Sequence, residues 1–195
     1  MNWLLPLVGF SLVSSVTPGP NNILLWASGA QFGFARTLPH VLGTAAGLGA
    51  MTLAVAAGLG VIITSVPEIA IAMKVAGSVY LLYLAYQIAG ANALRRGLVA
   101  RPLGLLQAAA FQVINPKAWI FALGSITTFR PTDMPILVGG ALVAVTMMIV
   151  IVPSASLWAG GGDVLSRLVE GDRPRRLVSL VLAAVVVATV ASVWI

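Results

Sequence analysis

Long apolar stretches separated by short polar connections run along the whole chain. A helix needs about 20 mostly apolar residues to cross the hydrocarbon core of a bilayer. The pattern allows two counts of spanning helices, and the less favoured one is five spans with one re-entrant segment. The main expectation is six spanning helices, near residues 4–25, 40–66, 69–94, 103–129, 134–159 and 177–195.

The low content of charged residues places these stretches in a membrane. Only 8% of the 195 residues are charged, and the mean hydropathy is +1.03. A soluble domain carries about 25% charged residues, so this chain has too few to cover a surface that faces water. The sequence therefore predicts an all-α integral membrane protein with one domain over residues 1–195.

Two of the expected spans are interrupted by proline in a polar setting. The first contains the run Thr17-Pro18-Gly19-Pro20-Asn21, and the fourth contains Asn115-Pro116-Lys117. Pro20 and Pro116 are 96 residues apart, which is close to half the chain. Three spans in each half would insert the second half upside down, so we expect inverted repeats, about 1–97 and 98–195.

The first interruption cannot be an ordinary helix, because proline lacks an N–H group and clashes with the preceding turn. Irregular backbone inside a membrane is tolerated only within protein or beside a wet cavity. A half-helix that starts there offers free N–H groups and partial positive charge to a carboxylate. A simple kink is the alternative reading of any single proline. The candidate substrate-binding residues are Thr17, Pro18, Gly19, Pro20, Asn21 and Asn22.

The second interruption adds a positive charge about halfway along its span. A lysine at mid-membrane depth costs roughly 2.5–3.5 kcal/mol on insertion scales, so such a residue usually faces a cavity or a partner. We expect Asn115, Pro116 and Lys117 to bind substrate, with Lys117 pairing with a carboxylate or exchanging a proton. Snorkelling of Lys117 to the interface is the alternative.

Other residues are candidates for packing first. Gly43 and Gly47 form a G-xxx-G pair, which lets helices approach closely. Tyr80 shares a helix face with Tyr83 and Gln87, and it is a candidate for either substrate contact or interhelical packing. His40 lies at the start of the second span, where a proton relay is the less favoured interpretation. Asp163 follows three glycines at an expected helix end and is a better candidate for proton coupling than His40, although a role without proton coupling is favoured for it too.

Arginine in the connections predicts the orientation of the chain. Short cytoplasmic loops carry an excess of Lys and Arg. On the opposite, outer side of the membrane, the expected loops carry only Arg130. Because no positive charge precedes the first apolar stretch, we expect a retained helix rather than a cleaved signal. The loops expected on the cytoplasmic side of the inner membrane carry Arg36, Arg95, Arg96, Arg101, Arg167, Arg173, Arg175 and Arg176.

The sequence lacks the residues that several classes of function require. The chain has no cysteine and one histidine, so a metal site or thiol chemistry is not expected, and no cofactor is expected. The net charge of +6 is explained by topology rather than by nucleic acid. There is no phosphate-binding glycine loop and no catalytic constellation, so we expect a secondary transporter rather than an enzyme.

The motifs together resemble the lysine exporter family, which includes the homoserine/threonine resistance exporters. The resemblance rests on Thr17–Asn22, on Gly33–Arg36 followed by the Gly43/Gly47 helix, on Lys74–Leu81, and on Phe111–Ala118. These stretches occur in order and span essentially the whole chain. The resemblance implies an inner-membrane exporter of amino acids or close derivatives, driven by the proton gradient, and it adds Gln112 to the candidate substrate-binding residues.

One position departs from the family pattern. Many members carry an acidic residue directly after the second glycine of the G-xxx-G helix, whereas this chain has Leu48. The departure favours a neutral amino acid over a cationic one such as lysine. The alternatives are a channel, or an exporter of another small solute on the same bundle. Membrane lipid is the expected surrounding, and the Gly43/Gly47 face is also able to join protomers of a homo-oligomer.

Overall fold

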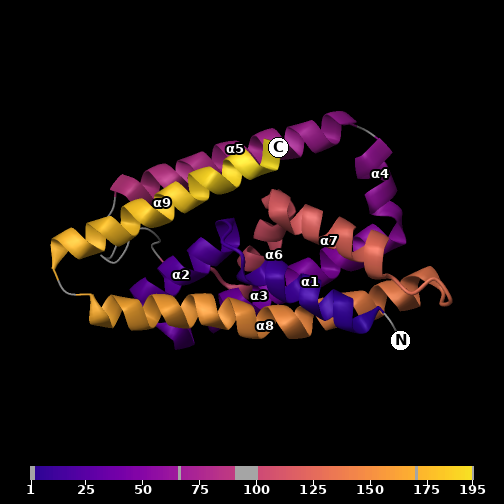
Figure 1. Cartoon of the computed structure of the whole chain (residues 1–195), viewed down its shortest axis with the longest axis horizontal. Coiled ribbons are helices and arrows are strands. Elements are labelled where there is room, and N and C mark those ends of the chain that lie inside the picture. The colour runs from indigo at the N-terminus through magenta and orange to yellow at the C-terminus, as the bar shows by residue number, and fades with distance from the viewer. Residues whose placement is uncertain (1–2, 66, 91–100, 170, 195) are drawn as a thin grey trace.

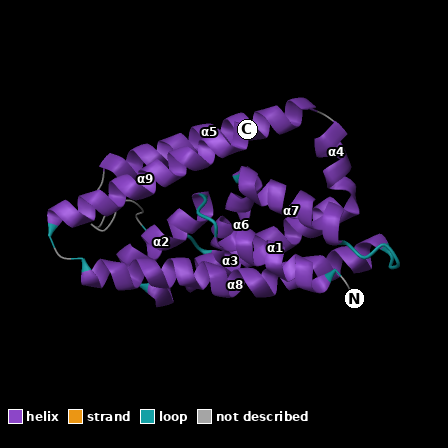
Figure 2. Ribbon diagram, in the orientation of Figure 1, coloured by secondary structure: helices purple, strands orange, loops and turns teal. Residues whose placement is uncertain are grey.

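The computed structural model describes residues 3–65, 67–90, 101–169 and 171–194, and within these ranges it is built from helices joined by short loops (Figures 1 and 2). The helices are α1 (Leu4–Val16), α2 (Pro20–Phe32), α3 (Phe34–Ala54), a π-helical turn η1 (Val55–Leu59), α4 (Gly60–Ser65), α5 (Pro67–Gly90), α6 (Leu105–Ile114), α7 (Pro116–Phe129), α8 (Ile136–Leu168) and α9 (Asp172–Trp194).

Both proline motifs break a span into two half-helices. Helix α1 ends at Val16 and α2 begins at Pro20, while α6 ends at Ile114 and α7 begins at Pro116. Proline favours the first position of a helix because its missing N–H would have no intrahelical partner there. The half-helix α2 continues to Phe32, so the first expected span, which ended near residue 25, was too short.

The second span begins earlier in the chain than the sequence predicts, and it is bent rather than straight. Its helix begins at Phe34 rather than near His40, because Gly33 takes a positive φ of 83° and ends α2 directly before it. The same span bends again at Gly58, whose φ is 113°. This left-handed conformation is readily available to glycine, and it separates α4 from α3.

Helix α8 is longer than the sequence predicts. It continues through Gly160, Gly161 and Gly162 to Leu168, so Asp163 lies inside a helix and not at its end. The glycines are held because α8 packs closely on α2: a Cβ on Gly162 would lie 2.0 Å from the carbonyl oxygen of Trp26. Helix α9 likewise starts at Asp172, earlier than the expected residue 177.

Three helical segments in the described residues are long and apolar enough to cross a membrane by length and composition: Phe34–Leu59, Ile71–Ala89 and Ile136–Leu168. Leu4–Val16, Leu105–Ile114 and Arg176–Ala191 are apolar but shorter. Broken spans explain the two shortest of these segments, because α1 and α6 are each only the first part of an interrupted stretch.

Helices α5 and α9 lie side by side along one flank of the molecule, and α8 runs along the opposite flank (Figure 1). Between them, α8 packs against α1, α2 and α3, and α3 packs against α6. One buried apolar cluster includes Val41, Phe121 and Met147. A second cluster joins α2, α5, α6 and α9 and includes Ile23, Leu81 and Val186. The two broken spans lie at the centre of this arrangement.

The connections fall at two ends of the bundle. The α8–α9 connection and the C-terminal end of α5 lie at one end, and the N-terminus and the α7–α8 connection lie at the other (Figure 1). The α2–α3 junction joins the first group, since the Phe34 N–H donates to Asp163 Oδ2 at 3.3 Å. Exposed arginines at these connections and before α6 are Arg36, Arg101, Arg167, Arg173 and Arg176. Arg95, Arg96 and the side chain of Arg175 lie outside the described residues.

Candidate functional site

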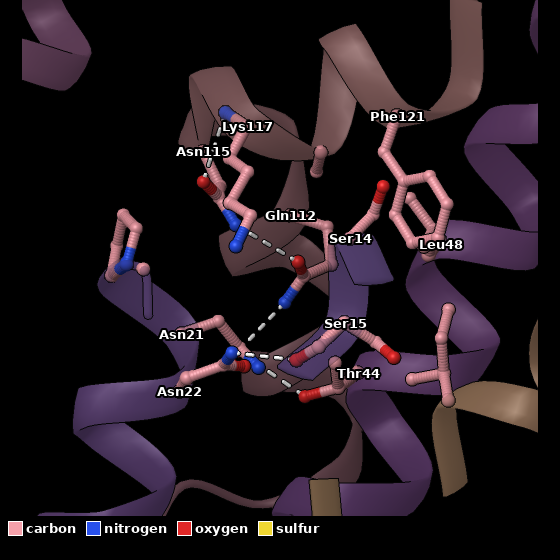
Figure 3. Close-up of a pocket in the computed structure, with 14 residues that line it drawn as sticks. Ser14, Ser15, Asn21, Asn22, Thr44, Leu48, Gln112, Asn115, Lys117 and Phe121 are labelled. Atoms are coloured by element: carbon pink, nitrogen blue, oxygen red, sulfur yellow. Dashed lines mark hydrogen bonds between the residues drawn. The ribbon is translucent and has the colours of Figure 1, made fainter. Parts of the chain in front are cut away.

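A cavity lies where the two proline breaks meet (Figure 3). Both breaks contribute to its wall, together with residues from α1, α3, α7 and α8. The breaks are about half the chain apart in sequence, so only the tertiary fold brings them together. The lining residues are Ser14, Ser15, Gly19, Pro20, Asn21, Asn22, Thr44, Leu48, Gln112, Asn115, Lys117, Ala118, Phe121 and Ile151.

Asn21 is the centre of a buried hydrogen-bond network. Its side-chain oxygen accepts from Gln112 Nε2 at 3.0 Å and from Thr44 Oγ1 at 3.2 Å. His40 Nε2 lies 3.4 Å from the same oxygen. Asn21, Thr44, His40 and Gln112 are all at most 6% exposed. One amide of the first break is thus tied to the second-half helix α6 and to α3.

The network continues into the second break. Asn115 Nδ2 donates to Gln112 Oε1 at 3.2 Å. Asn115 is also the N-cap of α7, since its side-chain oxygen accepts from the backbone N–H of Lys117 at 3.2 Å. Capping of this kind satisfies one of the N–H groups left free at a helix start. An unbroken series of hydrogen bonds therefore joins Asn21 to the start of α7.

Lys117 and Asn22 supply partners for the carbonyl groups that the first break frees. The ammonium of Lys117 donates to the carbonyl oxygen of Thr17 and to that of Pro18, the latter at 3.3 Å. Asn22 Nδ2 donates to the carbonyl oxygens of Ser15 at 2.7 Å and Thr17 at 2.9 Å. A cation at a helix C-terminus also complements the helix dipole, so Lys117 stabilises the end of α1.

The start of α2 is less completely capped than the start of α7. Its N-cap is Gly19, which has no side chain and makes no side-chain cap bond. The first N–H groups of a helix have no intrahelical partner, and Asn21 and Asn22, which follow Pro20, both line the cavity. This end of the cavity is therefore suited to an anionic group.

The rest of the wall is apolar and carries no acidic group. Leu48, Ala118, Phe121 and Ile151 line the cavity, and each of them is at most 6% exposed. Among the described lining residues there is no Asp or Glu, and Lys117 is the cation. Amide oxygens are the side-chain groups best placed here to accept from an ammonium.

The cavity is small in this conformation, at about 50 Å³. It has room for water but lies well below the roughly 300–1,000 Å³ of typical ligand pockets. A second, wider hollow of about 360 Å³ adjoins the break on the α9 side. Thr17, Pro18 and Lys117 line this hollow with Ile120 and residues of α9, so Lys117 borders both spaces.

The candidate residues from the sequence fall into three positions. Seven of them line the small cavity, namely Gly19, Pro20, Asn21, Asn22, Gln112, Asn115 and Lys117. Thr17 and Pro18 line the wider hollow. Pro116 is buried against Gly77, where a Cβ would lie 2.8 Å from the proline Cδ.

Three further candidates lie in packing contacts. The Tyr80 ring packs against Phe111, with ring centroids 5.4 Å apart, and Tyr80 is not among the residues that line the cavity. Its contact with substrate stays a prediction. Gly43 and Gly47 lie where α3 meets α6: a Cβ would come within 2.2 Å of the Leu105 carbonyl oxygen and 2.6 Å of Ala109, respectively.

Sequence reasoning missed several lining residues. Ser14 and Ser15 are small polar residues in an apolar helix, and Thr44 lies one residue after Gly43. These residue types are common in membrane helices, so nothing marks them individually. Leu48 was noticed only as a departure from the family pattern, and the structure places it in the cavity wall.

Comparison with known proteins identifies the family of the chain. The sequence model of the LysE type translocator family matches residues 12–193. Curated relatives named cysteine/O-acetylserine efflux protein occur in Escherichia coli O9:H4 (strain HS), Escherichia coli (strain K12) and Shigella flexneri serotype 5b (strain 8401). Each is 26% identical over 179 residues, which cover 91% of this chain and 90% of the relative. No solved structure matches the chain.

These findings classify the chain as a membrane transporter and not as an enzyme, because the matched family consists of translocators and the relatives are named for efflux. The match covers both proline breaks and all the cavity-lining residues. The chain belongs to the LysE type translocator family.

Proposed function

We propose that this protein exports neutral amino acids or close derivatives across the inner membrane, and that the proton gradient drives the export. The observation that carries the proposal is the meeting of two polar helix breaks at one cavity, whose described lining residues include a lysine and no carboxylate. The efflux of cysteine and O-acetylserine, for which the relatives are named, fits this chemistry because both are amino acids with an uncharged side chain at neutral pH.

The zwitterionic part of an amino acid matches the polar wall of the cavity. Its carboxylate would accept from the ammonium of Lys117 and from the free N–H groups at the start of α2. Its ammonium would donate to the amide oxygens of Asn21, Gln112 or Asn115. The side chain would then lie against Leu48 and Phe121, where a positive charge has no partner.

Binding would require the cavity to open. At about 50 Å³ the cavity corresponds to a contracted state. Lys117 separates it from the wider hollow beside α9, and the bonds of Lys117 to Thr17 and Pro18 hold this boundary in place. A substrate carboxylate would compete with these two carbonyl groups for the ammonium, which links binding to opening of the break.

We further infer that the chain is built as two inverted repeats with six spans. Under this assignment α1, α2, α3 and α5 correspond to α6, α7, α8 and α9. The helix contacts support it because they exchange between halves: α3 packs on α6 as α8 packs on α1, and α2 packs on α8 as α7 contacts α3. Helices α5 and α9, which correspond, pair with each other. The arginine-rich connections would then face the cytoplasm.

Transport by purified protein in proteoliposomes tests the function. We expect counterflow of labelled cysteine, O-acetylserine, serine or threonine, and much less counterflow of lysine. An imposed proton gradient is expected to drive uphill movement of the same substrate. The Asn115→Ala, Lys117→Ala double variant is expected to lose both activities while still entering the membrane.

A Thr127→Ala variant provides the matched control, because Thr127 lies on α7 but is exposed and bonds only to its own helix. Counterflow that persists in the double variant would overturn the assignment of the site. Downhill flux without any response to an imposed gradient would instead favour the channel alternative. Transport of solutes other than amino acids would overturn the proposed substrate class.

A further inference from the structure

His40 is a buried titratable residue that the substrate site itself does not include. It is 1% exposed and does not line the cavity. Its Nδ1 atom is buried without a hydrogen-bond partner among the described residues. An unpaired polar atom in a buried position costs free energy, so this nitrogen calls for an explanation. A proton that binds to this nitrogen only during part of the transport cycle would supply that explanation.

The other ring nitrogen connects His40 to the substrate site. His40 Nε2 lies 3.4 Å from Asn21 Oδ1, the oxygen that also accepts from Gln112 Nε2 at 3.0 Å and Thr44 Oγ1 at 3.2 Å. From Gln112 the series continues to Asn115 and to the first turn of α7. A change in the charge of the ring would therefore reach both helix breaks.

Gln112 Nε2 and Thr44 Oγ1 donate to a single oxygen, which has two lone pairs, and His40 Nε2 is a third donor to it in the tautomer that carries the proton on Nε2. A proton bound at Nδ1 would make the ring cationic and leave Nε2 as an obligatory donor. A charge-assisted bond is shorter and roughly twice as strong as a neutral one. His40 would then draw Asn21 toward itself, and the bond from Gln112 would weaken. Protonation would in this way loosen the contact that joins the two breaks.

Few other ionisable groups surround His40. Helices α2 and α6, which pack against α3, contain no Asp, Glu, Lys, Arg, His or Tyr. From α7 the charged group is Lys117, which bonds to Thr17 and Pro18. From α8 the charged groups are Asp163 and Arg167, which pair with each other at 2.9 Å. Arg36 on α3 itself is exposed.

We propose that His40 carries the coupling proton, bound at Nδ1, and controls the substrate site through Asn21. This inference rests on the proposed function, because it assigns a residue to the proton coupling of the same transporter. Histidine suits the role because it is the side chain whose ordinary pKa lies within the physiological range. The proton binds to the Nδ1 lone pair and leaves from it, so no covalent chemistry is required.

The first test compares two transport measurements in proteoliposomes. A His40→Gln variant keeps an amide donor for Asn21 but cannot bind a proton. We expect it to retain counterflow of the labelled neutral amino acid and to lose uphill transport driven by a proton gradient by about tenfold or more, within the usual range for coupling between sites. The wild-type counterflow rate should change as the pH is lowered and the ring becomes protonated, and that of the variant should not.

A Thr37→Ser variant serves as the control, because Thr37 is equally buried on α3 but bonds to Ser28 and to the Gly33 carbonyl. Uphill transport by His40→Gln with the wild-type pH profile would overturn the inference and leave the proposed function intact. Wild-type protein that shows neither counterflow nor uphill transport would overturn the proposed function itself.

A second measurement needs no variant and guards against misfolding of His40→Gln. The chain contains one histidine, so protein labelled with ¹⁵N-histidine and purified without a histidine tag gives ring signals from His40 alone. In lipid nanodiscs we expect these signals to change from those of the neutral ring to those of the protonated ring as the pH is lowered, and a saturating neutral amino acid to shift the midpoint. Signals that respond to neither pH nor substrate would contradict the inference.

Discussion

The ammonium of Lys117 donates a hydrogen bond to the carbonyl oxygen of Thr17, a residue 100 positions earlier in the chain. The contact joins the second proline break to the end of α1, and the Pro18 carbonyl oxygen receives a further bond at 3.3 Å. Lys117 therefore has two roles to reconcile. It stabilises the closed break, and under the proposed function it also receives the substrate carboxylate.

Replacing Lys117 by methionine is the first prediction. Bonds to charged groups are each worth about 1.5–3 kcal/mol, which corresponds to roughly 10–100-fold in an equilibrium constant. We expect Lys117→Met to weaken substrate binding by at least tenfold on this scale and to lower thermal stability. Binding measured by scintillation proximity and unfolding followed in detergent check both effects. Unchanged binding would contradict the role of Lys117, and Lys117→Arg, which keeps the charge, is the control.

Gly19→Ala tests the contact between the N-cap of α2 and the lysine. The backbone of Gly19 is extended, so alanine brings no backbone strain. Its Cβ would, however, lie 2.8 Å from Lys117 Cδ and 3.1 Å from Nζ. The flexible end of Lys117 can move to relieve this contact at little cost in stability, but its ammonium would then leave the Thr17 and Pro18 carbonyl oxygens, so we expect transport to fall. Gly9→Ala is the matched control, because nothing lies within 4 Å of that position. Equal transport by the two variants would refute the crowding argument.

Leu48 is an uncharged residue in the apolar wall of the cavity, and replacing it by an acidic residue tests the preference for neutral substrates. Leu48→Glu would place a carboxylate in a cavity whose described lining has none. A new bond to a charged group is worth about 1.5–3 kcal/mol, so we expect the ratio of lysine to threonine transport to rise about tenfold. Competition between the two labelled amino acids measures it. If Leu48→Gln, which is polar but uncharged, produced the same ratio, the charge would not be the cause.

The close crossing of α2 and α8 predicts a purely structural effect. A Cβ on Gly29 would lie 1.9 Å from the carbonyl oxygen of Ala159, so the helices must separate to admit it. We expect Gly29→Ala to destabilise the protein by about 1–3 kcal/mol, visible as a lower thermal midpoint in detergent. Gly161→Ala should leave the midpoint unchanged, because its nearest neighbour, Trp26 Cδ1, would be 4.0 Å away. Equal thermal midpoints for the Gly29→Ala and Gly161→Ala variants would show that α2 and α8 can separate without loss of stability.

The helix breaks could be predicted from the sequence because their cause is local. Pro20 and Pro116 lack an N–H group wherever they stand, so a break at each is a property of the residue. The length of α8 could not be predicted in this way. Gly160 to Gly162 normally end a helix, yet here Gly162 allows the contact with Trp26, which depends on the packing of two distant helices.

The composition of the site was predictable in part for the same reason. Asn21, Asn115 and Lys117 stand out because polar residues beside proline are rare in apolar spans. The bond between Asn21 and Gln112 depends on how α2 meets α6, and no local pattern encodes that. The sequence placed His40 at the start of a span, where a proton relay was the less favoured interpretation; in the structure it lies inside α3, beside Asn21.

Protection of an introduced thiol by substrate tests the central claim, that the two breaks form one substrate site. The chain has no cysteine, so Ser14→Cys places the only thiol in the cavity wall, and Thr128→Cys places one at an exposed position that lines a different hollow. A saturating neutral amino acid without a thiol, such as threonine, is predicted to slow maleimide labelling of Ser14→Cys and to leave Thr128→Cys unaffected. Equal labelling of Ser14→Cys with and without substrate, in protein that still transports it, would contradict the account.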